Sequence, residues 1–188
     1  EHLQAQGKIM VGWNEVLAAK NISTEVVAQY WTPRKDKNVI KHIKKGGDAI
    51  LSNHKYFYFD MTHEYCTVKD TYFFEAKKAG VKDKYIDSIL GVEAENWTEW
   101  TPTAEELFFK FSTRGLALSE CAWSRSRDYA DFLERLESNK ARLEKMGIYY
   151  GEDWVTLQKN KRCKKKAAKK LGLNSKNYDC EYELSVSK

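Results

Sequence analysis

The chain has 188 residues, of which 42% are hydrophobic and 13% aromatic, and its formal net charge is +5. This composition supports a hydrophobic core and excludes a globally disordered chain. The mean hydropathy of −0.68 and the lack of a long apolar run exclude a membrane-spanning helix. Four cysteines, at positions 66, 121, 163 and 180, are too few and too scattered for a disulfide-built miniprotein.

Four short apolar segments in the first half of the chain have the composition of buried strands. They cover residues 8–13, 25–31, 48–52 and 89–93. Between the second and third segments, residues 38–45 have apolar side chains at helical spacing, and Gly46 and Gly47 are placed to end that helix. Apolar strands that are separated by helices or long crossovers indicate a parallel sheet covered on both faces.

The second part of the chain is predicted to be helical. Thr103 and Glu106 have the spacing of a capping box, and helical periodicity continues from there to Trp123. A second helix is predicted over residues 129–146, with Gly147 where a helix stop is expected. The last segment, 174–188, has only a weak pattern.

These elements predict an α/β protein built as part of a barrel. A (β/α)8 TIM barrel takes at least roughly 200 residues, so four strands do not close one. We therefore expect residues 1–150 to form the second, C-terminal half of a (β/α)8 TIM barrel, and residues 151–188 to be a basic helical extension and tail. In such folds the chemistry gathers at the C-terminal ends of the strands.

Aromatic residues follow each predicted strand, most with a carboxylate close behind. The strand ends read GWNE (12–15), QYW (29–31), YFYFD (56–60) and ENWTE (95–99). Sugars present flat C–H faces and a ring of hydroxyls, which suit aromatic platforms beside carboxylate acceptors. Packing within the barrel explains any one of these aromatic residues equally well, but the repeated pattern favours a sugar-binding site.

Taken in order, GWNE, QYW, YFYFD, GVEAENWTEW and RGLALSECAWS resemble the second half of the catalytic barrel in family 20 glycoside hydrolases, the β-N-acetylhexosaminidases. The resemblance covers residues 8–150. It implies hydrolysis of terminal non-reducing N-acetylhexosamine residues by a retaining, substrate-assisted mechanism with an oxazoline-like intermediate. It implies no cofactor, a glycan or glycoconjugate ending in N-acetylhexosamine as partner, and an exported (extracellular or periplasmic) or lysosomal location.

The resemblance also implies a role for individual residues. The six site residues are Trp13, Trp31, Tyr58, Asp60, Trp97 and Glu99. The three tryptophans look like aromatic walls around the terminal sugar, and Tyr58 looks like the hydroxyl donor to the acetamido carbonyl oxygen. The two carboxylates look like acceptors for sugar hydroxyls, with Glu99 on the O4/O6 side. We interpret Arg114, Glu120 and Trp123 as structural residues of a helix.

One feature departs from the family pattern. An adjacent Asp-Glu pair, which contains the general acid, is expected at the end of the barrel's fourth strand, and no Asp-Glu dipeptide occurs in this sequence. We therefore expect the isolated chain to be inactive. Because it begins with Glu1, we expect it to start after processing or within a longer protein.

Two readings of the whole chain follow from this departure. In the first, its partner is the missing N-terminal half of the barrel. In the second, it is a non-catalytic sugar-binding or scaffold half-barrel that associates with a second copy of itself, since open sheet edges favour pairing. We expect no nucleic-acid or membrane partner.

The excess of positive charge is local. Residues 159–170 contain eight basic side chains and no acidic one, and the net charge of +5 becomes −3 when these eight are left out. The segment matches a nucleic-acid or nuclear-import patch, but the solvated face of a C-terminal helix has the same composition. Cys163 and Cys180 are candidates for pairing in an oxidising compartment.

Two further patterns compete with simpler explanations. His54, His63 and Cys66 lie close in sequence but lack the spacing of a zinc site, and we interpret them as loop side chains. Asn21 and Asn96 each begin an N-glycosylation sequon. We expect the sequon at Asn96 to be a chance occurrence, because a glycan there would obstruct the predicted sugar site.

Overall fold

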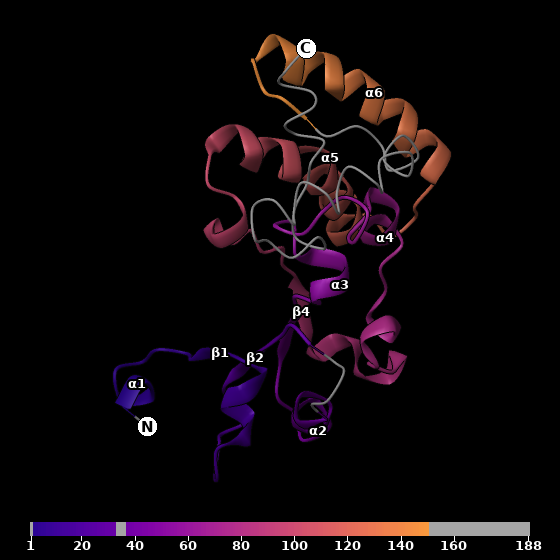
Figure 1. Cartoon of the computed structure of the whole chain (residues 1–188). Coiled ribbons are helices and arrows are strands. Elements are labelled where there is room, and N and C mark those ends of the chain that lie inside the picture. Colours follow the sequence, from indigo (N-terminus) through magenta and orange to yellow (C-terminus); the bar gives the residue numbers. More distant parts are fainter. Residues whose placement is uncertain (1, 33–36, 151–188) are drawn as a thin grey trace. The chain divides into compact units, whose positions relative to one another are not determined.

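The computed structural model describes residues 2–32 and 37–150, which form two compact units (Figure 1). The first unit contains Glu1–His54 and Phe74–Glu93, and the second contains Lys55–Phe73 and Ala94–Lys188. The basic segment 159–170, the predicted extension 151–188 and the pair Cys163 and Cys180 lie outside the described residues.

The first unit contains a parallel sheet, as predicted. Within the described residues it has four strands, β1 (Val11–Trp13), β2 (Val27–Tyr30), β3 (Ala49–Leu51) and β4 (Ile89–Val92). All neighbours are parallel, and the order in space, β1-β2-β3-β4, is the order along the chain. Every residue of β2 is buried, whereas β1 and β4 have exposed apolar side chains, so the central strands form the core.

Helix α2 (Asn38–Lys44) confirms the amphipathic segment predicted between the second and third strands. Its Val39 and Ile43 side chains are buried. Gly46 has a φ of 92°, a left-handed conformation that glycine adopts without strain. The other short elements of the unit are α1 (His2–Ala5) and the 3-10 helices η1 (Asn14–Ala18), η2 (Ala76–Ala79) and η3 (Asp83–Ser88).

The second unit is mainly helical. Helices α5 (Ala104–Trp123) and α6 (Tyr129–Lys145) confirm the two predicted helices to within a residue. Thr103 Oγ1 accepts a hydrogen bond from the Glu106 N–H at 3.2 Å, which is the Thr103 half of the predicted capping box. The remaining elements are α4 (Val68–Tyr72), η4 (Thr98–Trp100) and α3 (His54–Phe57), which begins at the boundary between the units.

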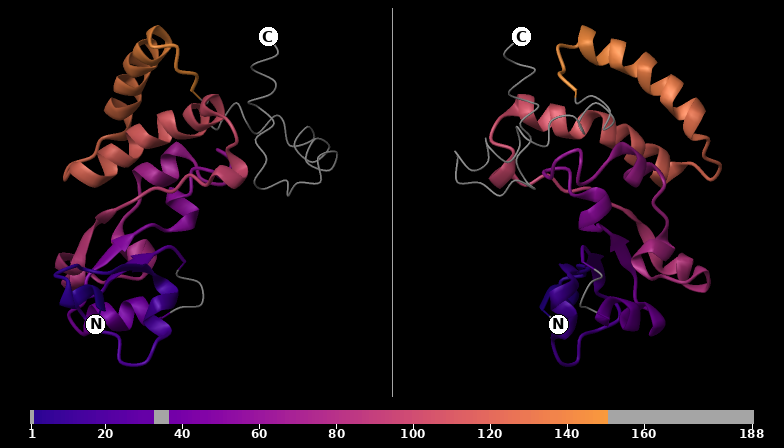
Figure 2. Two further views of the ribbon diagram at one scale, coloured as in Figure 1. Left: turned by 90° about the vertical axis from the view of Figure 1, so that its left-hand side faces the viewer. Right: turned by 45° about the vertical axis from the view of Figure 1, so that its right-hand side comes forward.

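The helices of the second unit share one apolar cluster, formed by Val68, Tyr72, Ala117, Phe132 and Leu136. These residues come from α4, α5 and α6, which lie together in both views of Figure 2. The Tyr72 ring lies at the centre, with the Phe132 centroid 4.8 Å away. Aromatic packing of this kind dominates the burial of a small core.

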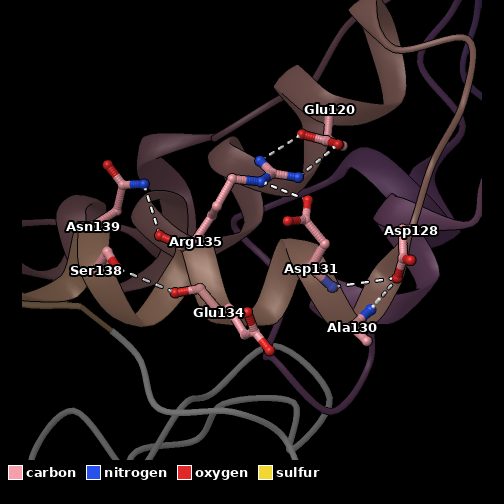
Figure 3. A network of polar contacts seen from close by, with 8 residues as sticks. All are labelled: Glu120, Asp128, Ala130, Asp131, Glu134, Arg135, Ser138 and Asn139. Carbon is pink, nitrogen blue, oxygen red and sulfur yellow. Dashed lines mark hydrogen bonds and ion pairs between the residues drawn. The ribbon is translucent and has the colours of Figure 1, made fainter.

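A polar network adds to the contact between α5 and α6 (Figure 3). Arg135 donates to both carboxylate oxygens of Glu120 at 2.9 and 3.0 Å, and its Nε donates to Asp131 at 2.8 Å. The bidentate geometry fixes the direction of Glu120, which supports its interpretation as structural. The Trp123 side chain is 89% exposed in this structure, and its structural role stays a prediction.

Candidate functional site

Two segments of the second unit meet at a short parallel bridge. Tyr58 pairs with Glu95. The Phe59 N–H donates to the Glu95 carbonyl oxygen at 2.7 Å, and the Glu95 N–H donates to the Phe57 carbonyl oxygen at 2.9 Å. These main-chain bonds hold residues 57–60 beside the segment that continues to Trp97.

Asp60 is the buried carboxyl group of this region, with 1% of its surface exposed. Burial raises its pKa to about 6, while a backbone hydrogen bond, Lys110 and Arg114 act to lower the pKa and Glu99 raises it further. The charges of Asp60 and Glu99 therefore interact, although Glu99 itself is exposed. Within the described residues, Asp60 Oδ1 has no hydrogen-bond partner.

Two aromatic side chains accompany these carboxyl groups. Tyr58 is 9% exposed, and Trp97, which precedes η4, is 45% exposed. A largely buried phenol, a half-exposed indole and two carboxyl groups thus belong to segments 58–60 and 97–99. Side chains of these types provide the apolar faces and hydrogen-bond acceptors that a small polar ligand requires.

The sequence analysis interpreted Arg114 as a structural residue of a helix and did not single out Lys110. Lys110 and Arg114 are both fully buried, one helical turn apart, and both act on the charge of Asp60. Basic residues in an amphipathic pattern are usually read as solvent-facing. The spacing alone therefore carried no signal that these two side chains point inward.

The two other predicted site residues, Trp13 and Trp31, belong to the first unit, where both are half-buried. Trp31 Nε1 lies 3.0 and 3.2 Å from the two carboxylate oxygens of Glu15 and donates to them. The indole of Trp31 is therefore oriented by a neighbouring carboxylate rather than by packing alone.

A second polar contact at the strand ends of the first unit was also missed. Gln29 Nε2 donates to Ser52 Oγ at 3.0 Å and to Glu93 Oε1 at 2.6 Å. These residues stand at or just beyond the ends of β2, β3 and β4. Gln29 and Glu93 belong to the strand-end motifs QYW and GVEAENWTEW. Their position at strand ends was the sequence feature that could have indicated this contact.

Tyr58, Asp60, Trp97 and Glu99 thus all lie in the second unit, on the two segments that the bridge joins. Trp13 and Trp31 are described within the first unit.

The side chains weighed as zinc ligands or glycan acceptors have other surroundings. The His63 ring lies edge-on to a phenylalanine, Phe109, at 4.9 Å, and Cys66 Sγ is 3.8 Å from Thr71 Oγ1. No cluster of three or more His, Cys, Asp or Glu suited to a metal occurs in the described part of the chain. The Asn96 side-chain nitrogen is buried, whereas Asn21 is exposed.

No helix among residues 2–32 and 37–150 is both long and apolar enough to cross a bilayer.

The model of the glycosyl hydrolase family 20 catalytic domain matches residues 1–126. The chain belongs to this family. Among relatives, the β-hexosaminidase of Porphyromonas gingivalis is 25% identical over 162 residues, which cover 79% of this chain and 20% of that protein. The β-N-acetylhexosaminidase of Cellulomonas fimi is 27% identical over 156 residues, covering 76% and 31%. The chain therefore spans between a fifth and a third of these curated relatives.

Solved structures of the glycoside hydrolase 20 family share this fold. The β-N-acetylhexosaminidase of Streptomyces coelicolor A3(2) superposes with a TM-score of 0.71 at 24% identity, covering 80% of this chain and 34% of that one. The chitobiase of Flavobacterium johnsoniae gives 0.61 at 30% identity, covering 77% and 22%. The four parallel strands and their helices thus match part of the TIM barrel of this family, as predicted.

Proposed function

We propose that this chain is the part of a β-N-acetylhexosaminidase that binds a terminal non-reducing N-acetylhexosamine. The observation that carries the proposal is the bridge between Tyr58 and Glu95, because it joins the segments that bear four of the six predicted site residues. Family membership supports the sugar as ligand, and a relative from Vibrio harveyi has been solved in complex with N-acetylglucosamine. We propose Trp13 and Trp31 as further aromatic contacts.

The proposed roles follow from the chemistry of the sugar. The Tyr58 hydroxyl donates to the acetamido carbonyl oxygen and so directs that oxygen toward C1. The exposed face of Trp97 contacts the acetamido methyl group. Asp60 and Glu99, when ionised, accept hydrogen bonds from sugar hydroxyls.

The proposed reaction of the whole enzyme is substrate-assisted. The acetamido oxygen attacks C1 while the general acid protonates the leaving glycosidic oxygen and the C1–O bond breaks, which gives an oxazoline-like intermediate; water then opens that intermediate at C1 with net retention. A fixed acetamido group makes the first step intramolecular, and such positioning supplies up to roughly 7–11 kcal/mol in well-oriented reactions.

We propose that the general acid and its aspartate partner come from outside these 188 residues. No Asp-Glu dipeptide occurs in the sequence, and the chain spans at most 31% of the two curated relatives. The isolated chain is then a binding unit without hydrolytic activity. We also propose that residues 1–150 are the partial barrel and residues 151–188 an extension.

Exposed apolar side chains of the first unit support a further partner. Ile9, Val11 and Leu90 are 73%, 51% and 58% exposed, and they lie on or beside the two strands that form the edges of the described sheet. Apolar edge strands favour pairing with more strand. We propose the remaining strands of the barrel as that partner; a second copy of the chain is the alternative.

Binding is tested by titrating the purified chain with N-acetylglucosamine and, as control, glucose, which lacks the acetamido group. We expect saturable shifts of tryptophan indole resonances with the first sugar and much weaker ones with the second. Tyr58→Phe removes the hydroxyl alone and is expected to bring the two sugars closer together in affinity. Equal affinity for both sugars in the unmodified chain overturns the proposed role of the acetamido group.

Two measurements test the missing catalytic pair and the partner. Release of 4-nitrophenol from its N-acetyl-β-glucosaminide by the purified chain, lost in Tyr58→Phe, contradicts the predicted inactivity. The mass of the native protein in its source is determined by immunoblot. A product much larger than 21.9 kDa supports the barrel partner, and a product of about that mass supports the self-associating alternative.

A further inference from the structure

We propose that Lys110 and Arg114 are positioning residues for the sugar site: each holds, by hydrogen bonds, the main chain next to one of the two candidate carboxylates, and together they place two positive charges beside this site. The inference rests on the proposed function, since it concerns the same site. It is carried by the hydrogen bonds of two buried cations on α5.

Arg114 holds the segment that contains Asp60. Its Nη2 donates to the Phe59 carbonyl oxygen at 2.6 Å, and its Nη1 donates to the Met61 and Cys66 carbonyl oxygens at 3.0 and 3.2 Å. Phe59 and Met61 are the residues on either side of Asp60. The guanidinium also lies 4.9 Å from the centre of the Phe59 ring. Because the planar guanidinium donates to three carbonyl oxygens, it fixes both the position and the direction of this segment.

Lys110 holds the segment that contains Glu99. Its Nζ donates to the carbonyl oxygen of Trp100, the residue that follows Glu99 at the end of η4. The same nitrogen is 3.2 Å from a carboxylate oxygen of Glu106, one turn earlier in α5. The Arg114 Nε donates to the Lys110 carbonyl oxygen at 2.6 Å, so the two residues that hold these segments are also hydrogen-bonded to each other within α5.

The electrostatics of this pair point to a role beyond packing. Two like charges one turn apart repel each other, and burying them costs free energy unless anions lie close by. The charged groups that act on Asp60 are Lys110 and Arg114 from α5 and Glu99 from the facing segment, and a backbone hydrogen bond also lowers the pKa of Asp60. Glu106 offsets part of the Lys110 charge, and the remaining positive charge favours ionised Asp60 against the effect of burial.

The test measures the titration of Asp60 and the pH dependence of sugar binding in the full chain. Aspartate carboxyl carbons are labelled with 13C, and the Asp60 signal is assigned by its loss in Asp60→Asn. Lys110→Gln keeps an N–H donor, on a side chain one bond shorter, and removes the charge. We expect the pKa of Asp60 to rise by about 1. N-acetylglucosamine affinity is then expected to fall about fivefold at pH 6 and to match the unmodified chain at pH 9.

Arg114→Lys separates position from charge. The charge remains, so we expect the pKa of Asp60 to stay at about 6, while the fork that binds Phe59 and Met61 is lost. Hydrogen exchange of the Met61 and Cys66 amides is then expected to accelerate at least tenfold. The same substitutions at exposed positions, Lys77→Gln and Arg125→Lys, are the matched controls and are expected to change neither readout.

The possible outcomes are distinct. If Lys110→Gln leaves the Asp60 titration unchanged, or weakens sugar binding equally at pH 6 and pH 9, Lys110 is merely structural and the inference is overturned. Lys110→Met, which keeps the length of the apolar stem, repeats the titration if the glutamine variant does not fold. If the unmodified chain binds no sugar at any pH, the proposed function fails, but the Asp60 titration and the hydrogen exchange still decide the positioning role.

Discussion

The fully buried side chain of Asn14 binds the main chain at Trp31 through both its amide oxygen and its amide nitrogen. Its Oδ1 accepts from the Trp31 backbone N–H at 3.0 Å, and its Nδ2 donates to the carbonyl oxygen of the next residue, Thr32, at 2.8 Å. One amide at the end of β1 therefore fixes the main chain at the end of β2, where a proposed sugar-binding tryptophan stands.

Asn14→Asp is expected to destabilise the chain by about 3 kcal/mol at pH 7, because a buried carboxylate oxygen would face the Thr32 carbonyl oxygen. Because this carboxyl would have a raised pKa in the folded chain, the loss is expected to shrink as pH falls toward about 4 and to be smallest below it, where the protonated acid donates in place of the amide. Urea denaturation at the two pH values measures it.

The matched control for this change is Asn139→Asp. Asn139 Nδ2 also donates to one carbonyl oxygen, that of Arg135 at 2.9 Å, but on the exposed side of α6. We expect a cost of less than about 1 kcal/mol there. A similar loss of stability at both positions contradicts the proposed contribution of the buried Asn14 hydrogen bonds.

Asp60→Asn is expected to stabilise the fold at neutral pH. The pKa of Asp60 in the folded chain, about 6, lies above its ordinary value of 3.8, so the native state holds more protons than the unfolded state between these values. Stability from Asp60 therefore falls as pH rises from about 4 to 6, by at most about 3 kcal/mol. The side chain introduced by Asp60→Asn does not titrate, so the stability of the variant does not fall for this reason.

The measurement is the difference in free energy of unfolding between Asp60→Asn and the unmodified chain at several pH values. It is expected to grow from pH 4 to pH 7 in favour of the variant, while sugar binding is lost. A difference that stays constant with pH means that Asp60 titrates normally.

Trp97→Ala is expected to abolish N-acetylglucosamine binding while lowering stability by only about 1 kcal/mol, since nearly half of the side chain is already exposed. Trp123→Ala removes another exposed indole of the same unit and is expected to leave binding unchanged. Thermal denaturation and sugar titration of both variants check this. Equal binding losses would show that the effect is not local to Trp97.

Gly47→Ala is expected to destabilise the first unit by about 1–3 kcal/mol. A Cβ at this position would collide with the imidazole of His42, which is buried and has its Nε2 2.7 Å from the Val26 carbonyl oxygen. Gly91→Ala is the control, because a Cβ there meets nothing within 4 Å. Chemical denaturation is expected to separate the two variants clearly; matching midpoints would contradict the close approach at Gly47.

Long or strongly patterned elements were predictable from sequence. The strands are short but nearly all apolar, and α5 and α6 have periodicity over at least four turns with capping side chains at Thr103 and Asp128. Helices of four or five residues, such as α3 and α4, are too short for a period to show. Thr67 and Asp70 form a capping box at the start of α4. Their spacing is visible in the sequence, but no long apolar run follows it to indicate a helix.

The residue types of the candidate site could be predicted from the sequence, but the buried cations that hold its main chain could not. Aromatic and acidic residues after strands are visible in sequence, and the structure brings Tyr58, Asp60, Trp97 and Glu99 into neighbouring segments. The burial of Lys110 and Arg114 depends on carbonyl groups roughly 10 to 55 residues away in the chain, as the partners Trp100 and Phe59 illustrate. No local pattern encodes contacts of that range.

The bridge at Tyr58 has a consequence for how this region tolerates change. Its bonds use the N–H and carbonyl groups of Glu95 and make no use of the Glu95 side chain. Any residue other than proline, which lacks the N–H, supplies the same two bonds. A substitution of Glu95 by any residue except proline therefore leaves both bridge bonds available, and the main chain on either side of Tyr58 keeps its anchor.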